Sequence, residues 1–430
     1  MRRIAIIGAG PSGFYAADSL FKSGQPFQVD MFDRLPTPFG LLRGGVAPDH
    51  QKMKSVGSYY DRIATTNPTF SFFGNVHVGK DISVDELKQY YDALIFSYGA
   101  ETDKHLGIPG ESLPGSYTAT EFVGWYNGHP DYQDRQFDLS HDSVAIIGQG
   151  NVAIDVTRIL AKTPHELSTS DMTQAAMDAL SKSNIKNIYL IGRRGPAQSA
   201  FTELEIKELG NLDDCDIRVR PEDMNIDVPT ESKAARNYAI LKGFSEKAPK
   251  PASKIIHVRF YLSPLEFQPG AITFEINQLD AEQRAVGTGK KETLPCGLMF
   301  RSIGYKGIAM PGLPFDEKKG VVPNTDGRVA PGIYVCGWIK RGANGVLGSN
   351  KPDGKQTVDC LLADLPQLSR PSAENIRTLL ESRSIQAISY ADWQKVDVEE
   401  VRRGQGKGKP REKFTSTSEI LSFLSKTLAV

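Results

Sequence analysis

Two glycine-rich turns carry the first chemistry that the sequence indicates. Residues 4–10 read IAIIGAG, and Gly8, Gly10 and Gly13 complete the pattern G-x-G-x-x-G. A buried strand, a tight turn and a helix in succession would aim backbone N–H groups and the positive helix end at a pyrophosphate. The next expected strand ends in Asp33, 20 residues after Gly13, the spacing of a carboxylate that binds ribose hydroxyls. The pattern predicts a dinucleotide site, with a turn that holds no ligand as the alternative.

The second turn differs from the first in the residues that end its next strand. Residues 144–150 read VAIIGQG, and Gly148 and Gly150 are followed by the small Ala153. The strand expected next, NIYLIGRRG, ends in Arg193 and Arg194 and not in an acid. Two guanidinium groups suit a 2′-phosphate, which a carboxylate would repel. We therefore expect NADP(H) at this turn in preference to NAD(H), and a solvated strand end is the alternative.

One site with an acid and a second site with an arginine pair predict a tightly held FAD and an exchangeable NADPH. Near the end of the chain, the segment GIYVCGWIKRGANGVLGSNKPDG begins at Gly332. Its glycines allow close backbone approach, and Trp338 offers a flat apolar surface. Such a segment is suited to lie under a flavin ring with its backbone amides toward the ring.

The cysteines limit how electrons leave the flavin. The chain has four, Cys215, Cys296, Cys336 and Cys360, and they form no C-x-x-C pair. This argues against a disulfide scaffold, a zinc module and an iron-sulfur cluster, and we expect no metal site. Without a redox pair beside it, the flavin has to pass electrons directly to a carrier, dioxygen, a quinone or a small electrophile.

Composition narrows the class of protein. The 430 residues hold 51 Lys plus Arg against 51 Asp plus Glu, which argues against a nucleic-acid binder recruited by overall charge. Hydrophobic residues are 40% and charged residues 24%, as in ordinary globular proteins of two or three domains. We find no membrane-spanning stretch and no presequence. These features predict a soluble, bacterial-type cytoplasmic protein, with a processed form in the mitochondrial matrix as the alternative.

Longer blocks of the chain resemble one known family. PTPFGLLRGGVAPDH from Pro36 to His50, GQGNVAIDVTRIL, GRRGPAQSAFTELEIKE and GWIKRGANGVLGSNKPDG follow one another between residue 4 and about residue 360. Together they are similar to the adrenodoxin reductase type of ferredoxin NADP reductase. The resemblance implies an enzyme that moves hydride from NADPH to FAD N5, and then single electrons to a ferredoxin- or adrenodoxin-like iron-sulfur protein. The reverse direction is equally compatible with it.

The resemblance also implies cofactor contacts, carried over position by position. Beyond the first glycine turn, those for FAD are Ser12, Asp33, Leu41, Val78, Trp338, Gly345, Val346 and Leu347. Those for NADP are Gln149, Gly150, Asn151, Val152, Arg193 and Arg194, with Glu205 on the adenosine ribose and Gly345 near the nicotinamide. Many relatives have Glu where this chain has Asp33, so the reach to the ribose is shorter here.

A small polar set completes the implied site. The family pattern places His50, Asp155 and Glu208 near the nicotinamide and the flavin, and we take them as candidate catalytic residues. A histidine with an ordinary pKa near ~6.5, held by a carboxylate, is suited to relay a proton. A turn histidine and a surface aspartate are the alternative interpretations of His50 and Asp155.

An acidic iron-sulfur partner calls for a basic docking face, even on a chain without net charge. Candidates are Lys207, and Lys233, Arg236 and Lys242 on an expected helix. A separate run, VRRGQGKGKPREK, holds six basic residues against Glu412, and its Gly and Pro residues predict a loop. Docking and simple solvation are both open for this run.

The predicted fold is α/β with two doubly wound Rossmann-like dinucleotide-binding domains. Residues 1–105 would form the first part of the FAD domain, 106–302 the NADP domain, and 303–430 the second part of the FAD domain with a C-terminal extension. Two other functions remain as alternatives. One is a sensor or scaffold that binds both cofactors without turnover. The other is an electron-input subunit of an amidotransferase-type flavoenzyme, although such subunits carry cysteine-rich segments that this chain lacks.

Overall fold

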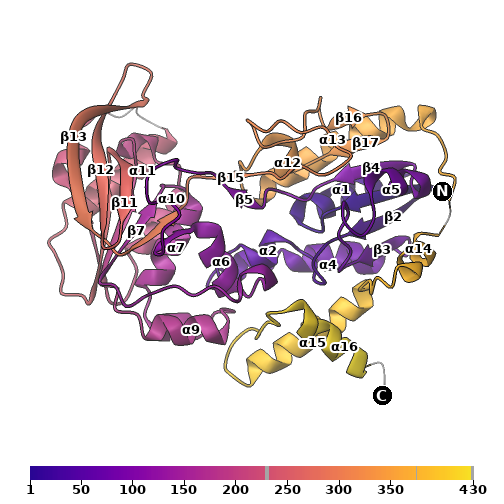
Figure 1. The fold of residues 1–430 in the computed structure, drawn as a ribbon, viewed down its shortest axis with the longest axis horizontal. Helices are drawn as coiled ribbons and strands as arrows, with labels where there is room; N and C mark the ends of the chain where they lie inside the picture. The colour runs from indigo at the N-terminus through magenta and orange to yellow at the C-terminus, as the bar shows by residue number, and fades with distance from the viewer. Residues whose placement is uncertain (228–231, 374, 428–430) are drawn as a thin grey trace.

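The protein folds into two lobes, seen side by side in the computed structural model of Figure 1. The structure describes residues 1–227, 232–373 and 375–427. Each lobe is built on its own six-stranded sheet, and the chain enters the second lobe from the first and then returns. The prediction of two doubly wound α/β units is confirmed. No helix among the described residues is long and apolar enough to cross a membrane.

The first sheet draws its strands from both ends of the chain. Its spatial order is β16 (Arg328–Ala330), β17 (Ile333–Val335), β4 (Ala93–Phe96), β1 (Arg2–Ile7), β2 (Phe27–Phe32) and β3 (Phe70–Phe73). All neighbouring pairs are parallel except β16 with β17. Along β1, Ile4 and Ile6 join one apolar core while Ala5 and Ile7 join another. The sheet is therefore covered on both faces, as its apolar strands require.

Helices cover this sheet and continue beyond it. In chain order they are α1 (Pro11–Lys22), α2 (Leu41–Gly44), α3 (Gln51–Lys54), α4 (Gly57–Thr66), α5 (Val84–Tyr90), α12 (Trp338–Arg341), α13 (Asn350–Asp364), α14 (Ile376–Ser382), α15 (Tyr390–Gln405) and α16 (Thr417–Thr427). The helix predicted after the first glycine turn is α1, which ends just before Gly24.

The second sheet is parallel throughout. Its order is β6 (Ser116–Thr118), β14 (Leu298–Arg301), β7 (Ser143–Ile147), β8 (Asn187–Ile191), β10 (Lys254–Arg259) and β9 (Cys215–Val219). Its helices are α6 (Ala119–Asn127), α7 (Asn151–Ala161), α8 (Pro164–Leu167), α9 (Gln174–Ser181), α10 (Glu203–Leu209) and α11 (Lys233–Ser245). On β7, Val144 and Ile146 face one core and Ala145 and Ile147 the other, so this sheet is also covered on both sides.

Two smaller sheets complete the fold. β5 (Thr102–Asp103) pairs with β15 (Tyr305–Lys306) where the chain crosses between the lobes. β11 (Leu262–Gln268), β12 (Ala271–Leu279) and β13 (Ala285–Pro295) form an antiparallel sheet that projects from the second lobe in Figure 1. One face of this antiparallel sheet packs onto the second lobe through Phe267, Ile272 and Phe274.

The C-terminal segment ties the two lobes together through buried charges. After α15 the chain turns back toward α9 (Figure 1). Lys413 is 4% exposed, and its Nζ lies 3.2 Å from Asp171, which also binds Lys54 at 2.6 Å. Glu400 is fully buried and pairs with Arg43 at 2.5 Å. We call these five residues, Arg43, Lys54, Asp171, Glu400 and Lys413, the clasp.

The basic run VRRGQGKGKPREK begins as the end of α15 and continues as a loop, and part of it is buried against neighbouring segments. Its first residues belong to α15, where Arg402 and Arg403 both bind Glu399. Lys409 is 5% exposed and donates to the carbonyl of Met172. Most basic side chains of the run are paired within the fold, because they bind carboxylates and carbonyls of neighbouring segments.

Candidate functional site

The first glycine turn lies where strands of the first sheet end. Gly8 has φ +107°, and a Cβ there would lie 2.7 Å from the backbone of Ser97, which follows β4. A Cβ on Gly13 would lie 2.3 Å from the carbonyl oxygen of Gly8. Gly10 differs, because a Cβ there would meet nothing within 4 Å. Gly10 is also the N-cap of α1 and supplies no capping side chain, so the first N–H groups of α1 are available to an anion.

Segments distant in sequence converge on this turn. Ser12 Oγ donates to Asn350 Oδ1 at 3.0 Å, and a Cβ on Gly337 would lie 2.1 Å from Ser12 Oγ. Asp33 follows β2, and its carboxylate accepts hydrogen bonds from Ala9 N at 2.8 Å and Leu35 N at 2.9 Å. Burial raises the pKa of Asp33 to about 6. The structure thus brings the predicted ribose carboxylate to the turn, fixed by two backbone amides.

The other residues predicted to contact FAD differ in how exposed they are and in what they pack against. Gly40 has φ +48°, and a Cβ there would lie 3.0 Å from Gly10, so the adjoining Leu41 sits beside the turn with 44% of its surface exposed. Trp338 begins α12 and stacks on Tyr305, with ring centroids 5.4 Å apart.

The glycine segment after Trp338 runs past the same turn. Gly345 has φ +87°, Val346 is 60% exposed, and Leu347 packs against the core of the first lobe. Val78 is 4% exposed and belongs to the other core of that lobe, so its side chain is not available to a ligand.

The second glycine turn repeats the geometry of the first. Gly148 has φ +133°, and a Cβ there would lie 2.1 Å from the carbonyl oxygen of Ser302. Gly150 is the N-cap of α7 without a capping side chain, and a Cβ there would meet nothing within 4 Å. Both turns therefore have room and donors for a pyrophosphate, which is the fit that two dinucleotides require.

The residues around the second turn hold the segment that leads into α10. The backbone oxygen of Gln149 accepts from Phe201 N at 3.0 Å, and Asn151 Oδ1 accepts from Thr202 N at 2.9 Å. Val152 is half-buried against the core of the second lobe. The turn and the start of α10 thus form one hydrogen-bonded unit.

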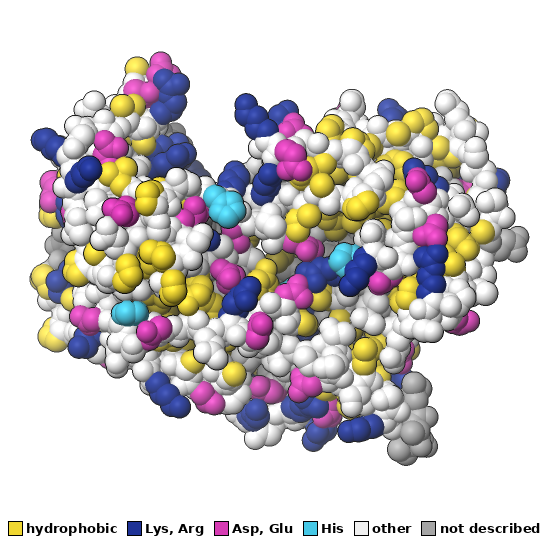
Figure 2. All heavy atoms as spheres, viewed as in Figure 1, with side chains coloured by type: hydrophobic (Ala, Val, Ile, Leu, Met, Phe, Trp, Pro, Cys, Tyr) yellow, Lys and Arg dark blue, Asp and Glu magenta, His cyan; other side chains and the backbone are white. Residues whose placement is uncertain are grey.

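The arginine pair projects from the end of β8. Arg193 and Arg194 are both exposed, and neither guanidinium forms an ion pair with a carboxylate of the described residues. Two unneutralised guanidinium groups beside a glycine turn provide the charge that a phosphate monoester needs. Figure 2 shows a notch between the two lobes with Lys and Arg side chains on both of its sides.

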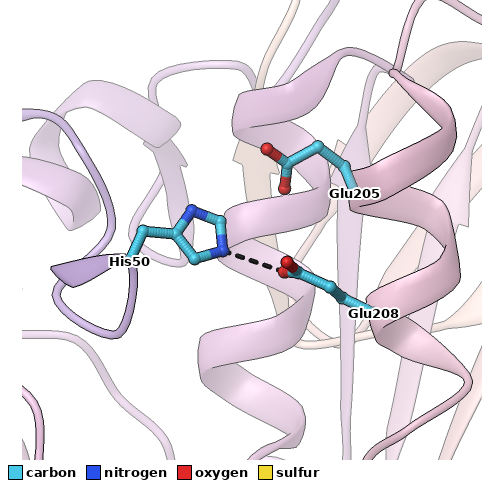
Figure 3. A group of neighbouring side chains, drawn as sticks. All are labelled: His50, Glu205 and Glu208. Carbon is cyan, nitrogen blue, oxygen red and sulfur yellow. Dashed lines mark hydrogen bonds and ion pairs between the residues drawn. The ribbon is translucent and has the colours of Figure 1, made fainter. Parts of the chain in front are cut away.

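His50 meets the carboxylates of α10 where the lobes join (Figure 3). His50 Nε2 lies 2.8 Å from Glu208 Oε2, and His50 Nδ1 lies 4.0 Å from Asp155 Oδ1. The structure therefore unites the three predicted catalytic residues, two from helices of the second lobe and one from the first. It also places Glu205 in this cluster, one turn from Glu208 on α10.

Arg158 is the centre of this cluster, and the sequence interpretation did not include it. It is 1% exposed, and its guanidinium reaches Asp49 at 2.8 Å and Asp155 at 2.7 Å. Its Nη1 also lies 3.4 Å from Glu205 and 3.5 Å from Glu208. A signal was available, because Arg158 lies three residues after Asp155 on the same helix and Asp49 directly precedes His50.

The pKa values in the cluster follow from its charges. Burial lowers the pKa of His50, but the hydrogen bond with Glu208 and the charges of Asp155 and Asp49 together hold that pKa above its ordinary value. The same bond lowers the pKa of Glu208. Burial raises the pKa of Asp155, and burial together with the nearby Asp155 raises the pKa of Glu205 to about 7.

Four carboxylic acids, those of Asp49, Asp155, Glu205 and Glu208, thus face two permanent cations, Arg158 and Lys162. The surplus of negative charge favours proton binding on His50 and Glu205. Ligand atoms of His50, Glu205 and Glu208 all lie within 4.8 Å of one another, as in a metal site. Because Arg158 already brings a positive charge against both glutamates, the cluster is better suited to protons than to a metal ion.

Two open glycine turns, one in each lobe, and a proton-binding cluster where the lobes join are the features of a flavoprotein oxidoreductase that uses a pyridine nucleotide. A family model for pyridine nucleotide-disulphide oxidoreductases matches residues 2–190. The NADPH-ferredoxin reductase FprA of Mycobacterium tuberculosis is 41% identical over 97% of this chain and 98% of its own length. The human mitochondrial NADPH:adrenodoxin oxidoreductase is 42% identical over 98% of this chain and 92% of its own length.

Solved structures agree with these relatives. Mycobacterium tuberculosis FprA in complex with NADPH superposes with a TM-score of 0.95 at 40% identity, covering 98% of this chain and 99% of that one. The chain belongs to the family of NADPH-ferredoxin and NADPH:adrenodoxin reductases. The predicted family, the predicted oxidoreductase class and the predicted cofactors, FAD and NADP(H), are thereby confirmed.

Proposed function

We propose that the chain transfers hydride from NADPH to FAD N5 and delivers the electrons singly to a ferredoxin- or adrenodoxin-like iron-sulfur protein, in either physiological direction. The observation that carries this proposal is the junction of the lobes, where His50 of the first lobe meets Asp155 and Glu208 of the second, and each lobe has an open glycine turn. The names of the family relatives support the choice of donor and acceptor.

The first lobe is proposed as the FAD domain, made of residues 1–105 and 303–430. The N–H groups at the start of α1 would bind the pyrophosphate, and the Asp33 carboxylate would accept from the ribose. Ser12, Leu41, the Val78 backbone, Trp338 and residues 345–347 would line the rest of the site. These residues would hold the flavin in the first lobe.

Residues 106–302 are proposed as the NADP domain. The turn of residues 149–152 would bind the pyrophosphate, and Arg193 with Arg194 would bind the 2′-phosphate. Glu205 is proposed to contact the adenosine ribose. Its place beside Arg158 and its raised pKa make it a second candidate for holding a proton.

His50 is proposed as the proton-relaying residue. Its Nε2 shares a proton with Glu208, while Asp155, held by Arg158, lies on the Nδ1 side of the ring. A group with two carboxylate neighbours can bind a proton and release it without moving far. His50→Gln is expected to retain both cofactors and slow proton-coupled electron transfer at least about tenfold, within the range for general acid-base groups.

The acidic partner is proposed to dock on the second lobe near α10 and α11. Lys207 is exposed on α10, and Lys233, Arg236 and Lys242 lie on α11. Arg236 and Lys242 are balanced in part by Glu203 and Glu246. Ferredoxin-dependent reduction should fall steeply with added salt while dye reduction does not, and equal salt dependence of both rates would contradict the docking proposal.

Anaerobic stopped-flow mixing with NADPH and NADH tests the core of the proposal. Flavin bleaching should be much faster with NADPH, and cytochrome c reduction should depend on an added ferredoxin. Equal bleaching by NADH would contradict the role of Arg193 and Arg194. A yellow protein that binds NADPH without bleaching would favour the sensor alternative.

A cytoplasmic location is also proposed, and it is supported by the similarity to the bacterial relative. The human and Arabidopsis relatives are named as mitochondrial, so the mitochondrial matrix remains the alternative. Fractionation of source cells decides between them.

A further inference from the structure

The loop that carries the arginine pair is held by the antiparallel sheet of β11–β13. Three successive carbonyl groups just after β8 each accept one hydrogen bond from this sheet or from Tyr261, the residue directly before β11. The bonds are Leu262 N to Gly192 O at 3.0 Å, Asn277 Nδ2 to Arg193 O at 2.8 Å, and Tyr261 N to Arg194 O at 3.1 Å. Because three consecutive peptide planes are fixed, the directions in which the two arginine side chains leave the backbone are fixed as well.

Asn277 makes the one bond of these three that comes from a side chain. It is 7% exposed, and its Nδ2 also donates to Ser263 Oγ at 2.8 Å. The Arg193 carbonyl only accepts, so the amide has to present its nitrogen to it. Asn277 lies where the pairing of β12 with β13 shifts between Glu275 and Asn277. Such an irregularity re-aims a side chain, here toward the arginine loop.

Two further contacts hold the same loop. Tyr261 adopts φ +58°, and its ring lies so close to Gly195 that a Cβ on Gly195 would meet Tyr261 Oη at 2.4 Å. Gln198 Nε2 donates to Gln283 Oε1 at 2.9 Å, beyond the end of β12. The sheet thus contacts the loop along its length, while the guanidinium groups of Arg193 and Arg194 stay exposed.

We propose that Asn277 is a positioning residue for nucleotide specificity, which preorganises Arg193 and Arg194 to bind a 2′-phosphate monoester. The proposal rests on the function proposed above for the arginine pair. Preorganisation matters because each flexible side chain that must be ordered on binding weakens the affinity. Asn277 acts through the backbone of Arg193 and does not itself touch the nucleotide.

The test separates the 2′-phosphate from the rest of the nucleotide. Binding of 2′,5′-ADP and of 5′-AMP to the FAD-loaded protein is measured by calorimetry, for the parent and for Asn277→Leu. Loss of one buried hydrogen bond is expected to weaken 2′,5′-ADP binding about threefold to tenfold and to leave 5′-AMP binding unchanged. The ratio of kcat/KM for NADPH over NADH should fall by the same factor.

Two further variants control for damage to the fold. Gln278→Leu makes the same change at the next residue of β12, whose side chain is exposed, and should alter neither ligand. Ser263→Ala removes the second acceptor of Asn277 and should give a smaller loss of the same kind, which keeps the proposal testable if Asn277→Leu folds poorly.

The double variant Arg193→Ala/Arg194→Ala tests the premise separately and should weaken 2′,5′-ADP binding about 100-fold or more. If the double variant binds both ligands like the parent, the proposed role of the arginine pair is wrong. If it loses 2′,5′-ADP selectively while Asn277→Leu and Ser263→Ala do not, the positioning role of Asn277 is overturned. Equal weakening of both ligands by Asn277→Leu would also overturn it, because that outcome indicates general damage to the lobe.

Discussion

The clasp leads to a prediction about stability that can be sized from the structure. Asp171 is 2% exposed and shares its carboxylate between the ammonium groups of Lys54 at 2.6 Å and Lys413 at 3.2 Å. Asp171→Asn keeps the volume of the side chain but leaves two neighbouring buried ammonium groups without their shared anion. We expect this variant to loosen the C-terminal segment from α9 and to lower the stability of the whole protein.

The pKa of Asp171 provides one measure of the loss. Burial opposes ionisation, but Lys413 and Lys54 lower the pKa from 3.8 to about 2. A shift of that size corresponds to roughly 2–3 kcal/mol. Because the folded-state pKa is depressed, this contribution is fully present above pH ~4 and is lost as the pH falls through ~2. Breaking a buried ion pair by removing one partner typically costs ~3–5 kcal/mol, so we expect a loss of about 2–5 kcal/mol at pH 7.

Thermal unfolding of the holoenzyme and limited trypsin digestion measure this effect. The apparent melting temperature should fall by about 4–10 °C, taking ~2 °C per kcal/mol for a chain of this size. Trypsin should cut the variant first after Lys413, which the parent buries. Asp359→Asn is the matched control, because Asp359 is half exposed and pairs only with Lys355 four residues earlier among the described residues. Its effect should stay below ~0.5 kcal/mol.

Two outcomes would refute this reasoning. A melting temperature for Asp171→Asn equal to that of the Asp359 control would show that the clasp contributes nothing. A lowered melting temperature without new cleavage in residues 404–413 would show that the lost stability lies elsewhere in the fold.

Further predictions concern the two turns and the proton-binding cluster. The side chains of Gly10→Val and Gly150→Val would point into open space at ordinary φ, so both variants should fold normally. Gly10→Val should lose FAD content, which absorbance spectra measure. Gly150→Val should keep FAD and lose NADPH affinity, which nucleotide titration measures. Glu205 has a raised pKa of about 7, so its contribution to stability is present below pH ~4.5 and lost as the pH rises through 7. Glu205→Gln should therefore raise the melting temperature at pH 8 and leave it nearly unchanged at pH 5. Arg158 lowers the pKa of His50 electrostatically, so Arg158→Gln should raise that pKa, which the histidine ring signals in an NMR titration would show.

The parts of the site that the sequence predicted are those with local causes. Each glycine turn lies within one strand-turn-helix unit, and the close approach of Gly13 to the carbonyl oxygen of Gly8 arises within that unit. The arginine pair follows its strand directly, so its position at the sheet edge also follows from the local order. The chain return that completes the first sheet was predicted from the glycines and Trp338 of a single segment.

The features that the sequence did not show depend on contacts between distant residues. Asn277 is 84 residues from Arg193, and no spacing rule connects a strand residue to a carbonyl of another sheet. The basic run near the C-terminus has the composition of a solvated loop, yet Lys413 meets Asp171, 242 residues earlier in the chain. A run of charges predicts exposure only when no other segment packs on it, and here the segment before α9 and helix α15 both pack on the run.

Buried ion pairs join the lobes at two places, and this bears on the chemistry. Asp49 binds Arg158 beside the proton-binding cluster, and Lys413 binds Asp171 in the clasp. An apolar contact of equal area could stabilise the junction as much, but it would let the lobes slide past each other. Short charged hydrogen bonds lose energy steeply when their two partners move apart. The His50–Glu208 bond itself spans the lobes at 2.8 Å, so a shift of one ångström between them would break it. Ionic contacts on both sides of that bond therefore maintain the geometry that a proton relay between two cofactor domains requires.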